Sequence, residues 1–204
     1  MWKPVLLLLL VALTAARAGA QGNTRAPNVI VLLADDLGWK DLGCYGSSFY
    51  ETPNLDRLAA AGTRFTQAYA TSPVCSPTRA SILTGKYPVR TGVTDWIRGR
   101  QEAGVARPFE KLVAQQTAYQ LALEEKTLAE TAREQGYQTF FAGKWHLGEE
   151  EAYWPAAQGF QVNKGGWSNG APTGRINDST GGFFTPYANP TLTDGPAGEY
   201  LTDR

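Results

Sequence analysis

The amino-acid sequence predicts an α/β fold, a layered structure in which strands alternate with helices. Apolar or alternating runs of strand length occur at 28–34, 63–69 and 138–142. Segments with helix start and stop signals occur at 52–62, 77–84 and 127–136. In folds of this class functional residues gather at the carboxyl ends of the strands, so we expect a site there.

The composition fits one packed domain and carries no charge signal for a partner. The chain has 204 residues, 43% of them hydrophobic, and its 19 basic side chains balance 19 acidic ones. This balance gives no electrostatic case for binding a nucleic acid or an anionic membrane surface, so we expect no nucleic-acid partner.

Residues 1–20 have the three-part pattern of a secretory signal peptide. Lys3 gives a basic start, 5–13 is an apolar run, and small residues end at Ala20. The apolar run is too short for a comfortable membrane span, although an uncleaved anchor is the alternative. We expect cleavage after Ala20, no stable membrane insertion afterwards, and a secreted or periplasmic location.

The run 28–34 is rich in β-branched residues and predicts a strand that is buried on both faces. It ends in two adjacent carboxylates, Asp35 and Asp36, which repel each other unless a cation lies between them. Carboxylate oxygens favour Ca²⁺ or Mg²⁺ over softer metals. A helix cap or a solvated turn is the alternative, and for a bare pair of aspartates it is the better supported one.

A loop rich in Gly, Ser and aromatic residues is expected at 37–50, with Cys44 inside it. The segment 52–62 then has a Thr cap, a Pro in the first turn and a Gly stop, which predict a helix. The alternation in 63–69 predicts a second strand.

The stretch from Cys75 to Arg79 predicts an anion site. Pro77 can begin a helix over 77–84, and Arg79 lies about one turn from the cysteine. Unpaired N–H groups and the positive end of the helix dipole favour negative charge at such a place. The alternative is structural, because an oxidising compartment permits a disulfide between Cys75 and Cys44.

The segment 86–107 is polar and predicts a surface loop. Trp96, Arg98 and Arg100 within it could line a substrate mouth, but a solvated loop is the better supported interpretation. Partial helix is expected at 109–125.

A capping-box pattern predicts a helix that opens at Thr127 and ends at Gly136. The third strand, 138–142, then delivers Lys144 and His146, whose side chains would point the same way in an extended segment. A lysine can hold an oxyanion and a histidine can move a proton. Taken alone, a solvated lysine and a structural histidine are better supported, and the flanking glycines modestly favour a site.

Three stretches, in this order, resemble the sulfatases of the arylsulfatase type within the alkaline phosphatase superfamily. They are Asp35-Asp36 after the first strand, the Cys75-x-Pro77-x-Arg79 signature continued to Gly85, and the segment from Gly136 to His146. The signature alone is a weak pattern, but the three together are specific. The resemblance implies a mixed, mostly parallel central sheet flanked by helices. It also implies that 21–204 is the N-terminal part of a catalytic domain, incomplete at its C-terminus.

The resemblance implies that a formylglycine-generating enzyme oxidises Cys75 to formylglycine. One hydroxyl of the hydrated aldehyde would attack the sulfur of a sulfate ester, and the second would then help to expel sulfate. The chain would thus belong to a sulfuric ester hydrolase whose substrate is a sulfated small molecule or a sulfated carbohydrate.

Roles on the substrate side follow from the matching positions. The resemblance implies that Arg79 pairs with the modified residue and that Lys144 holds sulfate. His146 would hydrogen-bond the diol and help the elimination. Ser168, within a stretch that is expected to be loop over 153–196, would add a polar contact to the substrate.

On the metal side, Asp35, Asp36 and the modified Cys75 would bind Ca²⁺ in preference to Mg²⁺. The sequence departs from the family here, because relatives supply further metal ligands, a second histidine and a second lysine from a later segment. His146 is the single histidine in this sequence. Two carboxylates are too few for Ca²⁺, which takes about six to eight oxygens. We therefore expect this polypeptide alone to be poorly active and imperfectly packed.

Other functions stay open. A phosphonate monoester or phosphodiester hydrolase of the same superfamily can carry the same signature. A non-catalytic exported module with a Cys44–Cys75 disulfide, or an inactive fragment, are further alternatives.

Overall fold

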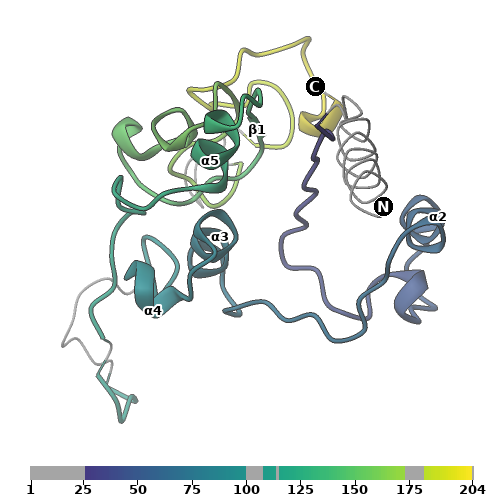
Figure 1. Cartoon of the computed structure of the whole chain (residues 1–204), viewed down its shortest axis with the longest axis horizontal. Helices are drawn as coiled ribbons and strands as arrows, with labels where there is room; N and C mark the ends of the chain where they lie inside the picture. Colours follow the sequence, from purple (N-terminus) through teal and green to yellow (C-terminus); the bar gives the residue numbers. More distant parts are fainter. Residues whose placement is uncertain (1–25, 100–107, 114, 173–181, 204) are drawn as a thin grey trace, which may run out of the picture. The chain divides into compact units, whose positions relative to one another are not determined.

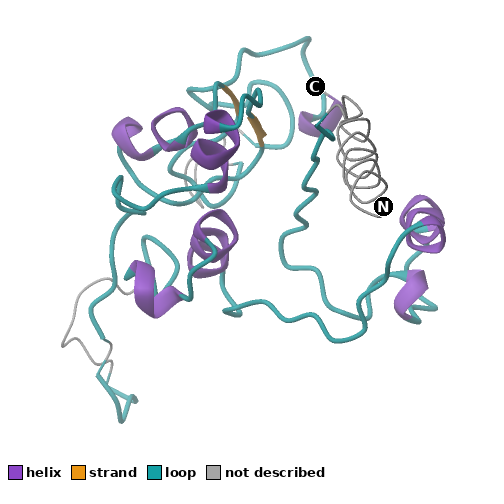
Figure 2. Cartoon of the chain, viewed as in Figure 1, coloured by secondary structure: helices purple, strands orange, loops and turns teal. Residues whose placement is uncertain are grey.

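The structure is a computed structural model that describes residues 26–99, 108–113, 115–172 and 182–203. The chain divides into two compact units, one ending at Arg57 and the other beginning at Leu58. The elements are short and joined by loops (Figures 1 and 2). With η for a 3-10 helix, they are η1 Gly43–Tyr45, α2 Pro53–Ala61, α3 Cys75–Thr84, α4 Pro88–Thr91, α5 Leu128–Glu134, β1 Phe140–Ala142, η2 Glu151–Tyr153, η3 Pro155–Gln158, β2 Val162–Lys164 and η4 Leu201–Asp203.

The buried strand expected at 28–34 is wrong. The segment is not a strand, and it is exposed, with 83% of Ile30 accessible to solvent. A strand that is buried on both faces needs neighbouring strands and covering helices. The described residues of the first unit include no strand that could pair with it.

The helix expected at 52–62 is confirmed as α2. Its start is fixed by side chains, since Asp56 accepts hydrogen bonds from the Cys44 amide at 2.7 Å and from the Thr52 hydroxyl at 3.0 Å. The Thr52 hydroxyl in turn accepts from the Gly43 amide at 2.8 Å. The loop that was expected before the helix is therefore tied to the helix, and it contains only the short turn η1 among its described residues.

The strand expected at 63–69 is also wrong, because the structure shows irregular and exposed chain there. Alternation of polar and apolar residues produces a strand only where a partner strand pairs with it.

The partial helix expected at 109–125 is wrong too, since no helix occurs among its described residues. Within the loop expected at 86–107, the structure instead forms the one-turn helix α4.

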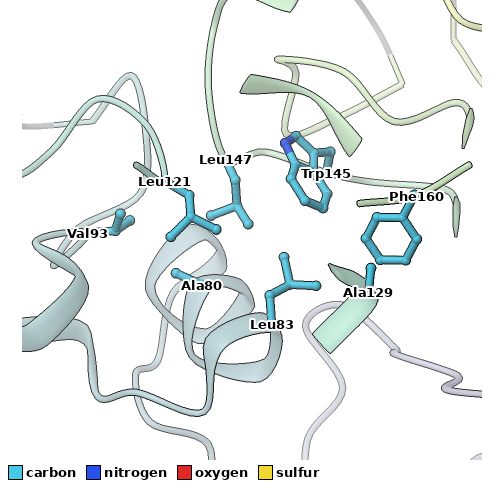
Figure 3. Close-up of a cluster of buried hydrophobic side chains, with 8 residues drawn as sticks. All are labelled: Ala80, Leu83, Val93, Leu121, Ala129, Trp145, Leu147 and Phe160. Carbon is cyan, nitrogen blue, oxygen red and sulfur yellow. The ribbon is translucent and has the colours of Figure 1, made fainter. Parts of the chain in front are cut away.

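The core of the second unit is built around α3, which packs against α4 and α5. The helix begins at Cys75, two residues earlier than expected, and ends where Gly85 takes a left-handed conformation with φ of 68°. Figure 3 shows the buried cluster on its inner side. The cluster consists of Ala80, Leu83, Val93, Leu121, Ala129, Trp145, Leu147 and Phe160.

The strand expected at 138–142 is confirmed in part as β1, which pairs in parallel with β2. The register places Phe140 opposite Val162 and Ala142 opposite Lys164. The second strand was missed, because it is three residues long and lies in a stretch whose composition is that of a loop. Helices with a small parallel sheet agree with the α/β class expected from the sequence.

No helix among the described residues is long and apolar enough to cross a membrane. The signal-peptide pattern at 1–20 lies outside the described residues.

The capping box predicted at Thr127 is confirmed. The Glu130 amide donates to the Thr127 hydroxyl at 3.2 Å, and the Thr127 amide donates to the Glu130 carboxylate at 2.7 Å. The same hydroxyl donates to the Gln158 carbonyl at 2.8 Å, and Thr127 is fully buried. One hydroxyl therefore fixes the start of α5 and attaches it to η3.

We predict that Thr127→Ala lowers the free energy of unfolding of the full-length protein by about 1–2 kcal/mol, because it removes a helix cap. Urea unfolding followed by circular dichroism measures the change. Thr127→Ser is the matched control, since it keeps the hydroxyl and should cost clearly less. Equal losses in the two variants would show that the methyl group, not the cap, matters.

Candidate active site

Cys75 is the first residue of α3, and its side chain is partly buried. The preceding residue, Val74, has extended backbone, and within the described part of the chain no side chain caps this end of the helix. The first N–H groups of a ten-residue helix and its dipole therefore act together beside Cys75. Such an end favours an anion.

Lys144 is the residue that the structure places against Cys75. It follows β1 and Gly143, whose amide donates to the Lys164 carbonyl at 2.9 Å and so extends the pairing of the two strands. From there the Lys144 ammonium Nζ donates to the Cys75 Sγ at 3.1 Å. Two predicted site residues that are far apart in the sequence thus meet.

Arg79 is buried on α3, one turn after Cys75, with only 9% of its surface exposed. Its guanidinium Nη1 donates to the backbone carbonyl oxygen of Lys144. The arginine therefore holds the main chain that carries the lysine, and it brings a permanent positive charge to the same place. Two cations and a helix N-terminus together make a positive environment around Cys75.

His146 is buried, with 4% of its surface exposed. Its φ is 60°, so the segment is not extended there, and the expectation that Lys144 and His146 point the same way for that reason is wrong. The ring Nε2 lies 2.9 Å from the Ile97 carbonyl oxygen. Because a carbonyl only accepts, this contact places a proton on Nε2.

Ser76 hydrogen-bonds to two distant segments of the site, and the sequence did not predict this role. Its fully buried hydroxyl donates to the His146 carbonyl at 2.8 Å and accepts from the Ile97 amide at 3.0 Å. Nothing in the local sequence marks this serine, because both partners come from distant segments. The residue after Cys75 therefore fixes the backbone on which the histidine sits.

Ser168 lies in a turn that packs on the histidine. It is 5% exposed. Two residues on, a Cβ added to Gly170 would come within 2.5 Å of the His146 Cε1, so only glycine lets the ring lie so close. The structure thus places Ser168 in the segment that covers His146.

Asp35 and Asp36 belong to the first unit, and both are exposed. Asp36 has φ of 56°, an uncommon conformation for a residue with a side chain. In the second unit the Lys144 Nζ contacts the Cys75 Sγ, Arg79 bonds to the Lys144 carbonyl, and Ser76 bonds to the His146 carbonyl. The approach of the two aspartates stays a prediction. The donor type fits Ca²⁺, but the described residues contain no group of three or more His, Cys, Asp or Glu side chains that could hold a metal.

Cys44 belongs to the first unit and Cys75 to the second, so the alternative disulfide between them is not tested by this structure.

Arg98 is exposed, as expected for a solvated loop, but its side chain is held by two partners. Its guanidinium Nε donates to the Glu149 carboxylate, and Nη1 donates to the Asn169 Oδ1 at 3.1 Å. Its φ of 68° costs about 1–2 kcal/mol, which is at least as much as an exposed ion pair contributes. Trp96 is 45% exposed, with its ring centroid 6.4 Å from that of His146; Arg100 lies outside the described residues.

Comparison with known proteins gives one family. A protein-family model described as Sulfatase matches residues 27–187. Human arylsulfatase A is 46% identical over 154 residues, which cover 74% of this chain and 27% of the relative. N-acetylgalactosamine-6-sulfatase of Canis lupus familiaris is 41% identical over 152 residues, which cover 74% of this chain and 28% of the relative.

Among solved structures, the crystal structure of Ps i-CgsB matches with a TM-score of 0.55 and 34% sequence identity. The match covers 67% of this chain and 27% of that one. The chain therefore spans little more than a quarter of the length of the proteins it resembles.

We predict that Ser76→Ala lowers the free energy of unfolding of the full-length protein by about 1–3 kcal/mol, because it leaves a buried carbonyl and a buried amide without their partner. Chemical denaturation measures the change. Ser81→Ala is the matched control on the same helix, since the described residues give the Ser81 hydroxyl, also buried, no hydrogen-bond partner. An equal loss in both variants would contradict the role given to Ser76.

Proposed function

The chain belongs to the sulfatase family, and from this we propose that the protein hydrolyses sulfate esters with a nucleophile made from Cys75. Family membership also agrees with the alkaline-phosphatase-like α/β fold class expected from the sequence. The observation that carries the proposal is the 3.1 Å contact between the Lys144 Nζ and the Cys75 Sγ at the N-terminus of α3. A positive charge lies where the sulfate group of a substrate would meet position 75.

The proposed nucleophile is formylglycine, made from Cys75 by a formylglycine-generating enzyme. In this structure the Sγ atom stands in for the oxygen atoms that the modified side chain would carry. When present, the modified residue supplies an oxygen nucleophile for attack on the sulfur of the ester.

Lys144 and Arg79 then have distinct roles. The ammonium of Lys144 binds sulfate oxygens and offsets the negative charge that develops on them in the transition state. Arg79 positions this lysine through its bond to the Lys144 carbonyl and adds a fixed charge from within the helix. Because both groups are held before substrate arrives, little reorganisation is needed during the reaction.

His146 moves a proton in this proposal. Its Nε2 is engaged with the Ile97 carbonyl, so the transfer takes place at Nδ1. Ser76 keeps the imidazole in place through the His146 backbone. Ser168, in the turn that covers the ring, makes a polar contact to the substrate.

We further propose that Asp35 and Asp36, with the modified Cys75, contribute to a Ca²⁺ site. A bound Ca²⁺ would supply positive charge next to the nucleophile. These oxygens fit its ligand preference but are fewer than it takes, so the two aspartates and position 75 would form only part of the ligand set.

The substrate class and location are proposals of the same kind. Arylsulfatase A and N-acetylgalactosamine-6-sulfatase, two of the relatives, are named for aryl and amino-sugar sulfates. We propose a sulfated small molecule or a sulfated carbohydrate for this protein. The signal-peptide pattern at 1–20 supports a secreted or periplasmic location.

We predict that peptide mass spectrometry of the protein from its natural export route finds formylglycine at Cys75, that is, sulfur replaced by oxygen together with the loss of two hydrogens, which distinguishes the aldehyde from a serine. Cys44 is the internal control, since it lies outside the signature and should keep its thiol. Finding Cys75 only as a thiol, or bridged to Cys44 in all molecules, would refute the proposed nucleophile.

We predict that Lys144→Ala lowers kcat/KM of the full-length protein for 4-nitrophenyl sulfate by roughly 100- to 1000-fold, because it removes a preorganised charge from the transition state. Lys164→Ala is the matched control, since Lys164 is an exposed lysine on β2 and should change the rate little.

The same assay with 4-nitrophenyl phosphate and a phosphonate monoester separates the rival function. A modified enzyme that prefers these esters to the sulfate would be a phosphonate monoester or phosphodiester hydrolase.

A further inference from the structure

Two separate segments of the chain enclose the imidazole of His146. The carbonyl oxygen of Ile97 lies 2.9 Å from the ring Nε2. On another edge of the ring, a Cβ added to Gly170 would lie 2.7 Å from Nδ1, so the glycine backbone packs against that atom. Nδ1 is shielded from solvent. The orientation of the ring therefore depends on how the segments of Ile97 and Gly170 are held together.

Arg98 joins these two segments. It directly follows Ile97 in the chain. Its guanidinium Nη1 donates to the Oδ1 of Asn169, the residue before Gly170, at 3.1 Å. Its Nε donates to the carboxylate of Glu149, three residues after the histidine. One side chain is thus connected to each of the three stretches of chain that meet at the ring.

The stability of the fold does not account for this arrangement. Arg98 has φ of 68°, a left-handed conformation that is costly for a residue with a side chain. The side chains of its ion pair with Glu149 are 49% and 40% exposed, and pairs at such exposure contribute little to stability. Asn169 is 8% exposed, so the bond that joins the two segments is the better shielded one. Backbone strain that persists in this way is found chiefly at functional sites.

The loop before Arg98 is held by other residues. The buried hydroxyl of Thr117 accepts from the amides of 94–95 at 2.8 and 3.2 Å. The Ser76 hydroxyl accepts from the Ile97 amide at 3.0 Å. Loss of the Arg98 side chain should therefore leave the path of this loop unchanged. What the loss would release is the turn on the other side of the ring.

We propose that Arg98 is a positioning residue for His146; the proposal rests on the sulfatase function proposed above. By holding Asn169, Arg98 keeps the neighbouring glycine against Nδ1, the atom at which the proposed function places the proton transfer. Such a transfer needs its groups within hydrogen-bond reach, and a small displacement lowers the rate steeply. Sulfate binding by Lys144 does not depend on this contact, so the effect belongs to kcat and not to KM.

The test uses Arg98→Lys and Asn169→Ala in the full-length protein, with 4-nitrophenyl sulfate as the substrate. Lysine keeps the charge but lacks the planar fork that bonds to two partners at once. We expect each variant to lower kcat about tenfold with KM unchanged, and the double variant to lose no more than either single one. Arg133→Lys, at an exposed arginine of α5, is the matched control and should keep the unmutated kcat. An unchanged kcat in Arg98→Lys, a change in KM alone, or additive losses in the double variant overturns the proposal.

Exchange of the ring N–H proton with water provides a readout without catalysis. In full-length protein labelled with nitrogen-15 histidine, the His146 signal is identified by its absence from His146→Gln. Because the Nε2 proton is bound to a carbonyl in a buried place, we expect slow exchange in the unmutated protein and roughly tenfold faster exchange in Arg98→Lys and Asn169→Ala. Equal exchange rates in the unmutated protein and in Arg98→Lys overturn the positioning role.

The two readouts separate this proposal from the proposed function. If the unmutated protein hydrolyses no sulfate ester, the proposed function fails, and the exchange rates still decide whether Arg98 positions the ring. Circular dichroism first establishes that the variants are folded. If Arg98→Lys is not folded, Asn169→Ala carries both measurements.

Discussion

The site depends on the burial of Trp145. Its side chain lies in the core with only 1% exposed (Figure 3). Its ring packs edge to face against that of Phe141, with a centroid distance of 5.2 Å. The residues on either side in the chain keep polar partners: Lys144 donates to the Cys75 Sγ, and the buried ring of His146 bonds to the Ile97 carbonyl. Packing of one large aromatic residue therefore sets the position of the backbone that carries two charged or titratable groups. Hydrogen bonds from α3 to the carbonyls of those same two residues complete the arrangement.

Features that are encoded locally could be predicted from the sequence. The capping box at Thr127 and the glycine stop at Gly85 act within one helical turn, so sequence spacing suffices to find them. Strands are different, because their stability comes from partners elsewhere in the chain. The apolar run at 28–34 has the composition of a buried strand, yet the described residues of its unit provide no neighbour. The short strand β2 shows the converse, since its parallel partner makes a strand of residues with no strand pattern.

The meeting of Cys75, Arg79 and Lys144 agrees with the motifs, but how they are held could not be predicted. Ser76 works through partners in two distant segments, so its role has no local pattern. The left-handed conformation of His146 depends on tertiary contacts and overrides the extended geometry that spacing alone suggests. The same limit applies to Arg98, because a polar loop has the same composition whether or not its side chains bond to distant segments.

The contact between Lys144 and Cys75 can form only after both residues have been synthesised. The two residues are 69 positions apart, and at synthesis rates of roughly 5–20 residues per second the cysteine precedes the lysine by several seconds. During that interval the thiol has neither the lysine nor the histidine segment beside it. Under the proposed function, this is when an enzyme that must reach Cys75 meets an open chain. Under that proposal, the exposed thiol that is modified and the partly buried position 75 beside Lys144 belong to successive stages in the life of one polypeptide.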